Sequence, residues 1–376
     1  MNIQAKVASS VSQRYAEGAK ERQEALCCPV DYDVALLKLL PQEIIERDYG
    51  CGDPSRYVQA GDTVLDLGSG GGKICYMAAQ LVGEGGMVIG VDMTDEMLAL
   101  ARKHQSGMAE KIGADRVRFL KGYIQDLALD VEAREEYLLA HPISSSDDSQ
   151  QFEQWQTQQR SERPLVGNDS IDLVVSNCVL NLVAEADREQ MLAEIFRVLK
   201  PGGRVAISDI VSDEAVPEHL RANEELWTGC ISGAFQEQQF AQAFLNAGFV
   251  LVNYDKWDEQ PWQEVEGIEF RSVTLMAVKP EPPLSLDVGQ AVIYRGPYSE
   301  VRDDEGHVYP RGQRIAVSAR TYSFLTEGPL KDEFIAINPA QPKPPVDFNA
   351  PAGTLRPAAE TKGATHNSGS SKSSCC

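Results

Sequence analysis

The chain has 376 residues and carries 35 Lys and Arg against 56 Asp and Glu, a formal net charge of −21 at pH 7. This balance, with no basic stripe, excludes nucleic acid and acidic membrane surfaces as partners, because phosphate binding needs a concentrated basic surface. No apolar run approaches the roughly 20 residues that cross a bilayer, and the polar N-terminus lacks the apolar core of a secretory signal. We therefore expect a cytoplasmic protein of about two domains, in which the eight cysteines are mostly reduced.

The first two thirds of the chain predict a helical start followed by an α/β domain. Residues 1–60 lack strand-like alternation and are expected to be helical. Over residues 61–256, short apolar runs alternate with helical patterns, which predicts right-handed βαβ units and a doubly wound, mostly parallel sheet. The expected strands are 63–67, 87–92, 117–120, 171–176 and 204–208.

Three further stretches differ from this pattern. Residues 141–164 are rich in Gln, Ser and Glu and poor in aliphatic side chains, which predicts a solvated insertion between the third and fourth strands. Short β-prone pieces separated by Gly and Pro follow, so residues 257–338 are expected to form a small, mainly β domain. Pro, Ala, Gly, Ser and Thr dominate residues 339–376, which predicts a disordered tail ending in Cys375 and Cys376.

The strongest local signal follows the first expected strand, where residues 64–72 read Val-Leu-Asp-Leu-Gly-Ser-Gly-Gly-Gly. A strand that runs into glycines lets the backbone approach a nucleotide-like ligand, and the next helix points its amides toward that ligand. Asp92 ends the following strand, at about the spacing where an acidic residue meets ribose hydroxyls. A dinucleotide site would favour a small residue at the sixth position of the motif, where this chain has Lys73.

This glycine-rich segment resembles motif I of the class I methyltransferases, which bind S-adenosylmethionine. The resemblance implies a Rossmann-like fold, with Asp66 at the methionine end of the cofactor, Asp92 on the ribose and Met93 on the adenine. The cofactor-binding residues that it implies are Asp66, Gly68, Ser69, Gly70, Asp92, Met93 and Ile124.

A more specific resemblance covers most of the chain. Tyr-Gly-Cys-Gly at 49–52, Ser-Asn-Cys-Val-Leu-Asn-Leu-Val at 176–183 and Trp-Thr-Gly-Cys-Ile-Ser-Gly-Ala at 227–234 stand in the order seen in arsenite methyltransferases. Residues 290–296 are similar to the small last domain of that family. The resemblance implies an enzyme that methylates trivalent arsenic, and it adds Asn177 to the cofactor-binding residues.

The same resemblance implies Cys51, Cys178 and Cys230 as arsenic ligands. Cys28, or less favourably Cys27, would pair with Cys51 and return electrons to arsenic. The residues themselves agree with a thiolate site, because Cys178 follows the fourth expected strand, at the edge where doubly wound sheets bind ligands, and thiolates favour soft, thiophilic centres. Arsenic is then the substrate, and we expect no separate metal cofactor. The expected partners are arsenite or methylarsenite as thiol conjugates and a thiol reductant such as thioredoxin or glutathione.

Two other functions stay open at this point. The chain could methylate a small organic acceptor, with structural cysteines, or it could bind a metalloid through thiols without catalysis. The intact cofactor motif argues against a binding protein, and the three cysteine motifs together argue against an organic acceptor. Cys75 is expected to be a buried core residue. For Cys375 and Cys376 two alternatives stay open: they capture the metalloid, or they have no role.

Overall fold

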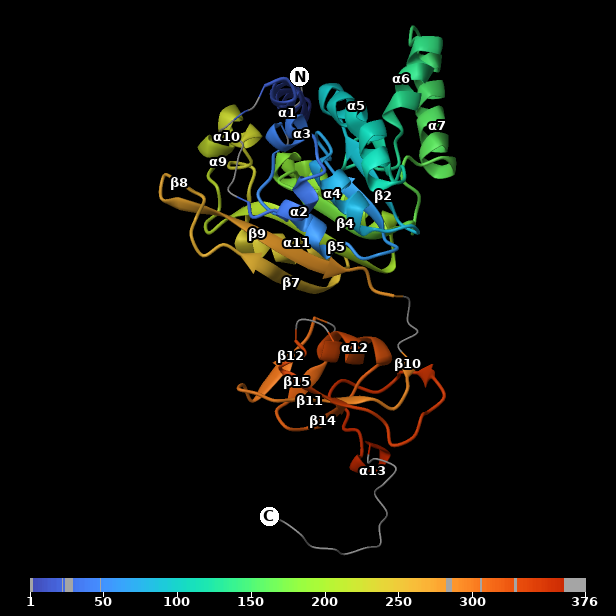
Figure 1. Cartoon of the computed structure of the whole chain (residues 1–376), viewed down its shortest axis with the longest axis vertical. Helices are drawn as coiled ribbons and strands as arrows, with labels where there is room; N and C mark the ends of the chain where they lie inside the picture. Colours follow the sequence, from blue (N-terminus) through green and yellow to red (C-terminus); the bar gives the residue numbers. More distant parts are fainter. Residues whose placement is uncertain are drawn as a thin grey trace, which may run out of the picture. The chain divides into compact units, whose positions relative to one another are not determined.

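The computed structural model describes residues 3–21, 23, 30–47, 49–281, 286–304, 306–327 and 330–361. The chain divides into two compact units, Met1–Pro280 and Glu281–Cys376, which are described separately below (Figure 1). Within the described ranges, no helix is long and apolar enough to cross a membrane.

The first unit is built on one sheet with the strand order β3-β2-β1-β4-β5-β9-β7. Its strands are β1 (Thr63–Leu67), β2 (Met87–Asp92), β3 (Val117–Lys121), β4 (Ile171–Asn177), β5 (Leu199–Ser212), β6 (Phe235–Gln236), β7 (Val250–Trp257), β8 (Gln263–Val265) and β9 (Ile268–Val278). The strands from β3 to β5 are parallel, and β9 is antiparallel to both β5 and β7. The strand order reverses between β1 and β4, and sheets of this kind bind ligands outside the carboxyl ends of the strands at such a point. The predicted class I methyltransferase fold is confirmed.

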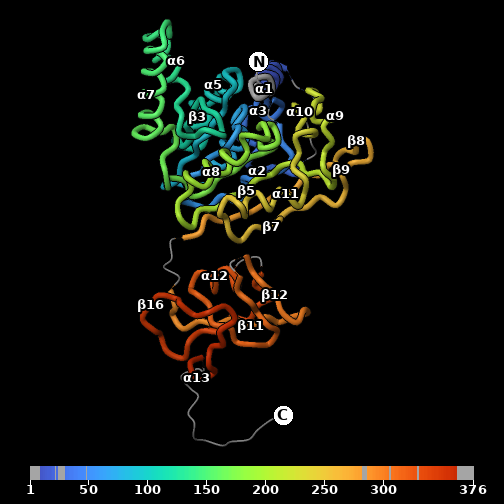
Figure 2. Tube along the Cα trace, turned by 180° about the vertical axis from the view of Figure 1, so that it is seen from behind, coloured from blue at the N-terminus to red at the C-terminus, as the bar shows by residue number. Residues whose placement is uncertain are grey.

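Helices pack on both faces of this sheet (Figure 2). The helices of the first unit are α1 (Ile3–Gly18), α2 (Val34–Leu37), α3 (Gln42–Glu46), α4 (Lys73–Leu81), α5 (Asp95–Ile112), α6 (Val131–Ala140), α7 (Ser146–Glu162), α8 (Arg188–Val198), α9 (Glu218–Arg221), α10 (Glu224–Thr228) and α11 (Glu237–Asn246). Alternate residues of a strand point to opposite faces, so Leu65 and Leu67 of β1 pack in one core with α8 and α11. Val64 packs in the other core with α4 and α5. Both faces of β1 are therefore buried, as is usual for a central strand of a parallel sheet.

The expected domain boundary at residues 256–257 is wrong. β9 pairs with β5 from Arg204 opposite Val278 to Ser212 opposite Phe270, so it belongs to the sheet of the first unit. That unit continues to Pro280. The β-prone sequence after Trp257 forms the antiparallel edge of the same sheet. Short apolar strands separated by turns are typical both of such an edge and of a separate small β domain, so the sequence alone does not distinguish the two.

The polar insertion contains α7, which forms a helical hairpin with the preceding helix α6 beside the β3 edge of the sheet (Figure 2). The α7 helix begins with a capping box in which Ser145 and Asp148 satisfy each other's backbone amides. The rings of Tyr137 and Trp155 stack at 4.4 Å between centroids and hold the two helices together. The stretch is solvated as predicted. It has few aliphatic residues because most of the surface of its helix faces solvent.

The second unit is small, and its described residues form short strands and two helices. Its elements are β10 (Leu286–Asp287), β11 (Ala291–Tyr294), β12 (Glu300–Arg302), β13 (Val308–Pro310), β14 (Arg314–Ala316), α12 (Ala319–Glu327), β15 (Phe334–Ile337), β16 (Val346–Asp347) and α13 (Ala358–Thr361). The sheet β14-β11-β15 packs around a core that includes Tyr294, Tyr309 and Phe334.

The expected disordered tail from residue 339 is wrong for residues 339–361. β16 pairs with β10 in this stretch, and Arg356 lies 2.7 Å from the carboxylate of Asp287. An ion pair and a strand pairing therefore hold this Pro-rich segment on the unit. Cys375 and Cys376 lie outside the described residues, so the two alternatives for them stay open.

Candidate functional site

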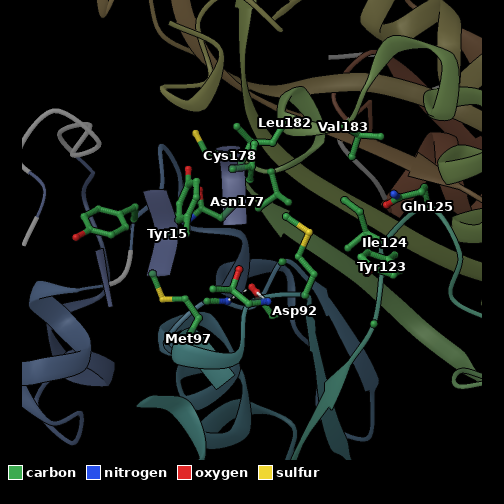
Figure 3. Close-up of a pocket in the computed structure, with 18 of the residues that line it drawn as sticks. Tyr15, Asp92, Met97, Tyr123, Ile124, Gln125, Asn177, Cys178, Leu182 and Val183 are labelled. Atoms are coloured by element: carbon green, nitrogen blue, oxygen red, sulfur yellow. Dashed lines mark hydrogen bonds between the residues drawn. The ribbon is translucent and has the colours of Figure 1, made fainter. Parts of the chain in front are cut away.

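A cavity of about 330 Å³ lies at the carboxyl ends of β1, β2 and β4, where the strand order reverses (Figure 3). Tyr123, Ile124 and Gln125 lie on one side of it, and Tyr15 and Cys178 lie on the other. Of the predicted cofactor-binding residues, those in its wall are Gly68, Gly70, Asp92, Met93, Ile124 and Asn177. The structure thus brings together six of the eight.

Asp92 ties the glycine turn to the start of α5. Its Oδ2 accepts a hydrogen bond from the amide of Gly70 at 2.9 Å, and its Oδ1 accepts one from the amide of Thr94 at 2.8 Å (Figure 3). Burial raises the pKa of this carboxyl. Each oxygen keeps a further lone pair, so the carboxylate can also accept hydrogen bonds from hydroxyls of a ligand in the cavity.

The glycine turn requires glycine both for its backbone conformation and because there is no space for a side chain. Gly68 has a φ of +67°, and a Cβ there would lie 2.5 Å from a methyl of Val179. A side chain at position 68 would therefore collide with Val179, which lines the same cavity, and only glycine adopts this conformation without strain.

Asp66 and Ser69, the other two predicted cofactor-binding residues, lie behind the cavity wall. The Sγ of Cys75 donates to Oδ2 of Asp66 at 3.2 Å, and both residues are buried. The prediction that Cys75 is a core residue is confirmed, with the addition that its thiol contacts the motif carboxylate.

Cys51 and Cys178 form a disulfide, with their Cα atoms 5.9 Å apart. Cys178 follows β4 with a φ of +60°, a conformation rare for residues other than glycine, and its amide donates to the carbonyl of Ser208 at 2.8 Å. Strained backbone of this kind concentrates at functional sites.

Asn177 holds the loop that carries Cys51. Its Oδ1 accepts hydrogen bonds from the amides of Cys51 and Gly52 at 2.9 and 3.0 Å, and its Nδ2 donates to the carbonyl of Gly52 at 2.8 Å. The next residue along the chain is Cys178. One side chain therefore aligns both halves of the disulfide while it also lines the large cavity.

Cys230 completes the group of cysteines. It has a φ of +61°, it is buried, and its Sγ donates to the carbonyl of Cys178 at 3.0 Å. It lines a second, smaller chamber of about 10 Å³, which holds about one water-sized sphere. The lining residues of this chamber are Tyr15, Tyr49, Gly50, Cys178, Ile210, Gly229, Cys230 and Trp262.

Tyr15, Tyr49 and Cys178 line both the large cavity and the small chamber. The three cysteines that the sequence singles out, Cys51, Cys178 and Cys230, therefore converge beside a space shaped for a nucleotide-sized ligand. This geometry suits the transfer of a group from one bound molecule to another.

Relatives of the chain agree with this geometry. A family profile described as a methyltransferase domain matches residues 59–141 and 144–248, and one described as a domain of unknown function matches residues 282–366. An arsenite methyltransferase from Aquipseudomonas alcaligenes is 33% identical over 83% of this chain and 84% of its own length. The human arsenite methyltransferase is 31% identical over 85% of this chain and 78% of its own length.

This chain belongs to the arsenite methyltransferase family. The crystal structure of an arsenic(III) S-adenosylmethionine methyltransferase from Chlamydomonas reinhardtii superimposes with a TM-score of 0.56 at 29% identity, over 83% of this chain and 98% of that one. The predicted family and the predicted class of enzyme are confirmed.

The cysteine pairing differs from the one that the resemblance to arsenite methyltransferases implies. That resemblance pairs Cys28 with Cys51, whereas Cys51 is bonded here to Cys178. Cys27 and Cys28 lie outside the described residues. The disulfide occupies two of the three expected arsenic ligands, and only a reductant can release them.

Two further residues of the site are not among those predicted from the sequence. Asp209, buried beside the disulfide, has a carboxylate oxygen within 4.8 Å of the Sγ atoms of Cys51 and Cys178, and burial raises its pKa to about 7. Tyr15 of α1 contacts Cys230, and burial together with this contact raises the pKa of its hydroxyl. Asp209 directly follows the expected strand 204–208, a position where a role could have been sought, but α1 carries no such signal.

Proposed function

We propose that this chain transfers methyl groups from S-adenosylmethionine to trivalent arsenic held by the thiolates of Cys51, Cys178 and Cys230. The observation that carries the proposal is the position of Cys178, which lies in the wall of the large cavity and also in the wall of the small chamber with Cys230. An arsenic atom on Cys178 and Cys230 would lie next to the cavity that suits the methyl donor.

The residues of the large cavity fit S-adenosylmethionine. Asp92 would hold the ribose hydroxyls, and Met93 and Ile124 would pack on the adenine. Gly68 and Gly70 line the cavity without side chains, which would give the methionine end close access to the backbone. When bound, S-adenosylmethionine supplies an electrophilic methyl group on a good leaving group, so the chain's own residues need only align donor and acceptor. The family profile supports the cofactor, and the absence of a resident metal cofactor stays part of the proposal.

The arsenic site would form only after the Cys51–Cys178 disulfide is reduced. Each thiol that then binds arsenite forms an As–S bond and breaks an As–O bond, and its proton leaves with the hydroxide as water. Three sulfurs leave the arsenic with a lone pair, and soft thiolate ligands suit this soft centre. The lone pair is the nucleophile, so no side chain has to act as a base on the acceptor.

Methyl transfer takes two electrons from arsenic, and two thiolates return them by forming a disulfide. We assign this step to Cys51 with Cys28 or Cys27. The disulfide in the structure joins Cys51 to Cys178 instead, so it supports only the ability of Cys51 to enter a disulfide. A cytoplasmic thiol reductant such as thioredoxin or glutathione would reopen the bond. Arsenite or methylarsenite would arrive as a thiol conjugate, which exchanges onto the cysteines.

The proposal is tested by incubating the reduced protein with arsenite and S-adenosylmethionine and then separating the arsenic species. Methylated arsenic is expected from the unmutated protein and from Cys75→Ser, whose thiol lies outside both chambers. Cys178→Ser and Cys230→Ser are expected to lose at least nine tenths of the activity. If no methylated arsenic forms, the proposal fails. Methylation of an organic thiol or amine in the same mixture would favour an organic acceptor, and arsenic binding without turnover would favour a metalloid-binding protein.

A further inference from the structure

The α1 helix is fastened to the segment that carries Cys230. The guanidinium of Arg14 donates to the hydroxyl of Thr228 at 2.6 Å and to the carbonyl of Glu225 at 3.1 Å, and Ser10 hydrogen-bonds the carboxylate of Glu224. These three acceptors lie on α10, which ends two residues before Cys230. The N-terminal helix is thus docked against one side of the small chamber.

Tyr15 is the α1 residue that enters the site. Its ring packs edge-on against Tyr49, with 6.2 Å between centroids, and it lines both the large cavity and the small chamber. It packs in one cluster with Cys230, and both residues line the small chamber, where burial together with proximity to Cys230 raises the pKa of the Tyr15 hydroxyl. The sulfur of Cys230 donates to the carbonyl of Cys178, and the Tyr15 side chain lies beside it in the same chamber.

We propose that Tyr15 is a positioning residue that holds the sulfur of Cys230 toward the arsenic chamber. When Cys230 binds arsenic it loses its thiol proton, and with it the hydrogen bond to the carbonyl of Cys178. The Tyr15 hydroxyl can donate to the thiolate that this change leaves, and a hydrogen bond to an ionised acceptor is stronger than one to a neutral thiol. It thus favours the arsenic-bound form of the site. This inference rests on the proposed function, because it assigns Cys230 as an arsenic ligand.

Docking of α1 is then part of the formation of the arsenic site. The Arg14 contacts hold α1 on the segment that carries Cys230, and Tyr15 then faces the same small chamber as Cys230. Arg14→Met is expected to weaken arsenite binding in the same direction as loss of the hydroxyl.

The test compares Tyr15→Phe, which keeps the ring and removes the hydroxyl, with Tyr57→Phe. The Tyr57 hydroxyl donates to a carboxylate oxygen of Asp255, and Tyr57 lines neither chamber. The full-length reduced proteins are titrated with arsenite, and binding is followed by tryptophan fluorescence, since Trp262 lines the chamber. S-adenosylmethionine binding is measured separately by calorimetry.

Tyr15→Phe is expected to weaken arsenite binding about tenfold, the usual contribution of a hydrogen bond to a charged group, while affinity for S-adenosylmethionine stays within about twofold. Tyr57→Phe should change neither affinity. Unchanged arsenite affinity in Tyr15→Phe would overturn the inference, and so would a parallel loss of affinity for both ligands. Because binding is measured without turnover, absence of methylation in the unmutated protein would count against the proposed function alone.

Discussion

The side-chain amide of Asn177 hydrogen-bonds the backbone at Cys51, 2.9 Å from its amide nitrogen, and so connects the end of β4 to the loop that carries a site cysteine. Asn177 also lines the large cavity. The wall of the cofactor cavity and the position of a cysteine are therefore held by one side chain.

Replacing this side chain should damage the site and the fold together. Asn177→Ala leaves the amides of Cys51 and Gly52 and the carbonyl of Gly52 without their partner. We expect the free energy of unfolding to fall by about 2–3 kcal/mol and the reduced protein to bind arsenite less tightly. Denaturant unfolding and arsenite titration measure the two effects. Asn253→Ala, which removes one local bond to Leu251, is the control and should leave arsenite binding unchanged.

Glu43 should make the free energy of unfolding depend on pH in the acidic range. Hydrogen bonds from Lys103 and His104 lower its pKa to about 2 from 4.5, and they join α3 to α5. A carboxyl whose pKa is depressed by folding stabilises the protein above its unfolded pKa, and this contribution is lost as the pH falls from 4.5 toward 2. The pairs face solvent in part, so Glu43→Gln should cost about 1 kcal/mol at pH 7. Denaturant unfolding measures the difference in free energy of unfolding between the Glu43→Gln variant and the unmutated protein. If this difference is as large at pH 2 as at pH 7, the assignment is wrong.

Arg160 of the α6–α7 hairpin should tune affinity for the methyl donor. Its guanidinium contacts both oxygens of Asp126, with the shortest distance 2.7 Å, and Asp126 follows the turn Tyr123–Gln125 in the cavity wall. Arg160→Met should loosen this turn and weaken S-adenosylmethionine binding about fivefold, as expected for a half-exposed ion pair worth about 1 kcal/mol. Calorimetry measures this. The exposed Arg163 near the end of the same helix provides the matched control Arg163→Met, and equal losses in both variants would rule out a specific role for Arg160.

The sequence predicts those parts of the site that depend on short motifs directly after strands. Asp92 ends β2, and Cys178 follows β4, so the topology of the sheet alone brings them to the same edge. Cys230 was assigned by its motif, and it also lies beside Cys178. In each case a few residues that are neighbours in the sequence are enough to predict that the side chain belongs to the site.

The parts that could not be predicted depend on contacts between distant segments. Tyr15 reaches Cys230 only because α1 docks on α10 through Arg14, and nothing in the local sequence of α1 indicates that contact. The domain boundary was wrong for a similar reason, since the pairing of β9 with β5 is non-local. Which two cysteines form a disulfide also depends on tertiary approach, and it cannot be deduced from cysteine positions in the sequence.

The Cys51–Cys178 disulfide should control whether arsenic can bind. In the oxidised protein two of the three proposed ligands are bonded to each other, so arsenite should bind at least tenfold more weakly than after reduction, because an arsenic bound by one thiolate lacks the other two As–S bonds. Reduction should restore binding of one arsenic per chain. Intact-mass measurement after alkylation, with and without a prior reductant, gives the number of thiols released, and arsenite titration of the same samples gives the affinity. Cys51→Ser cannot form this disulfide, so the weak binding that remains in it should no longer respond to reductant. Tight binding by the oxidised, unmutated protein would mean that arsenic is held elsewhere.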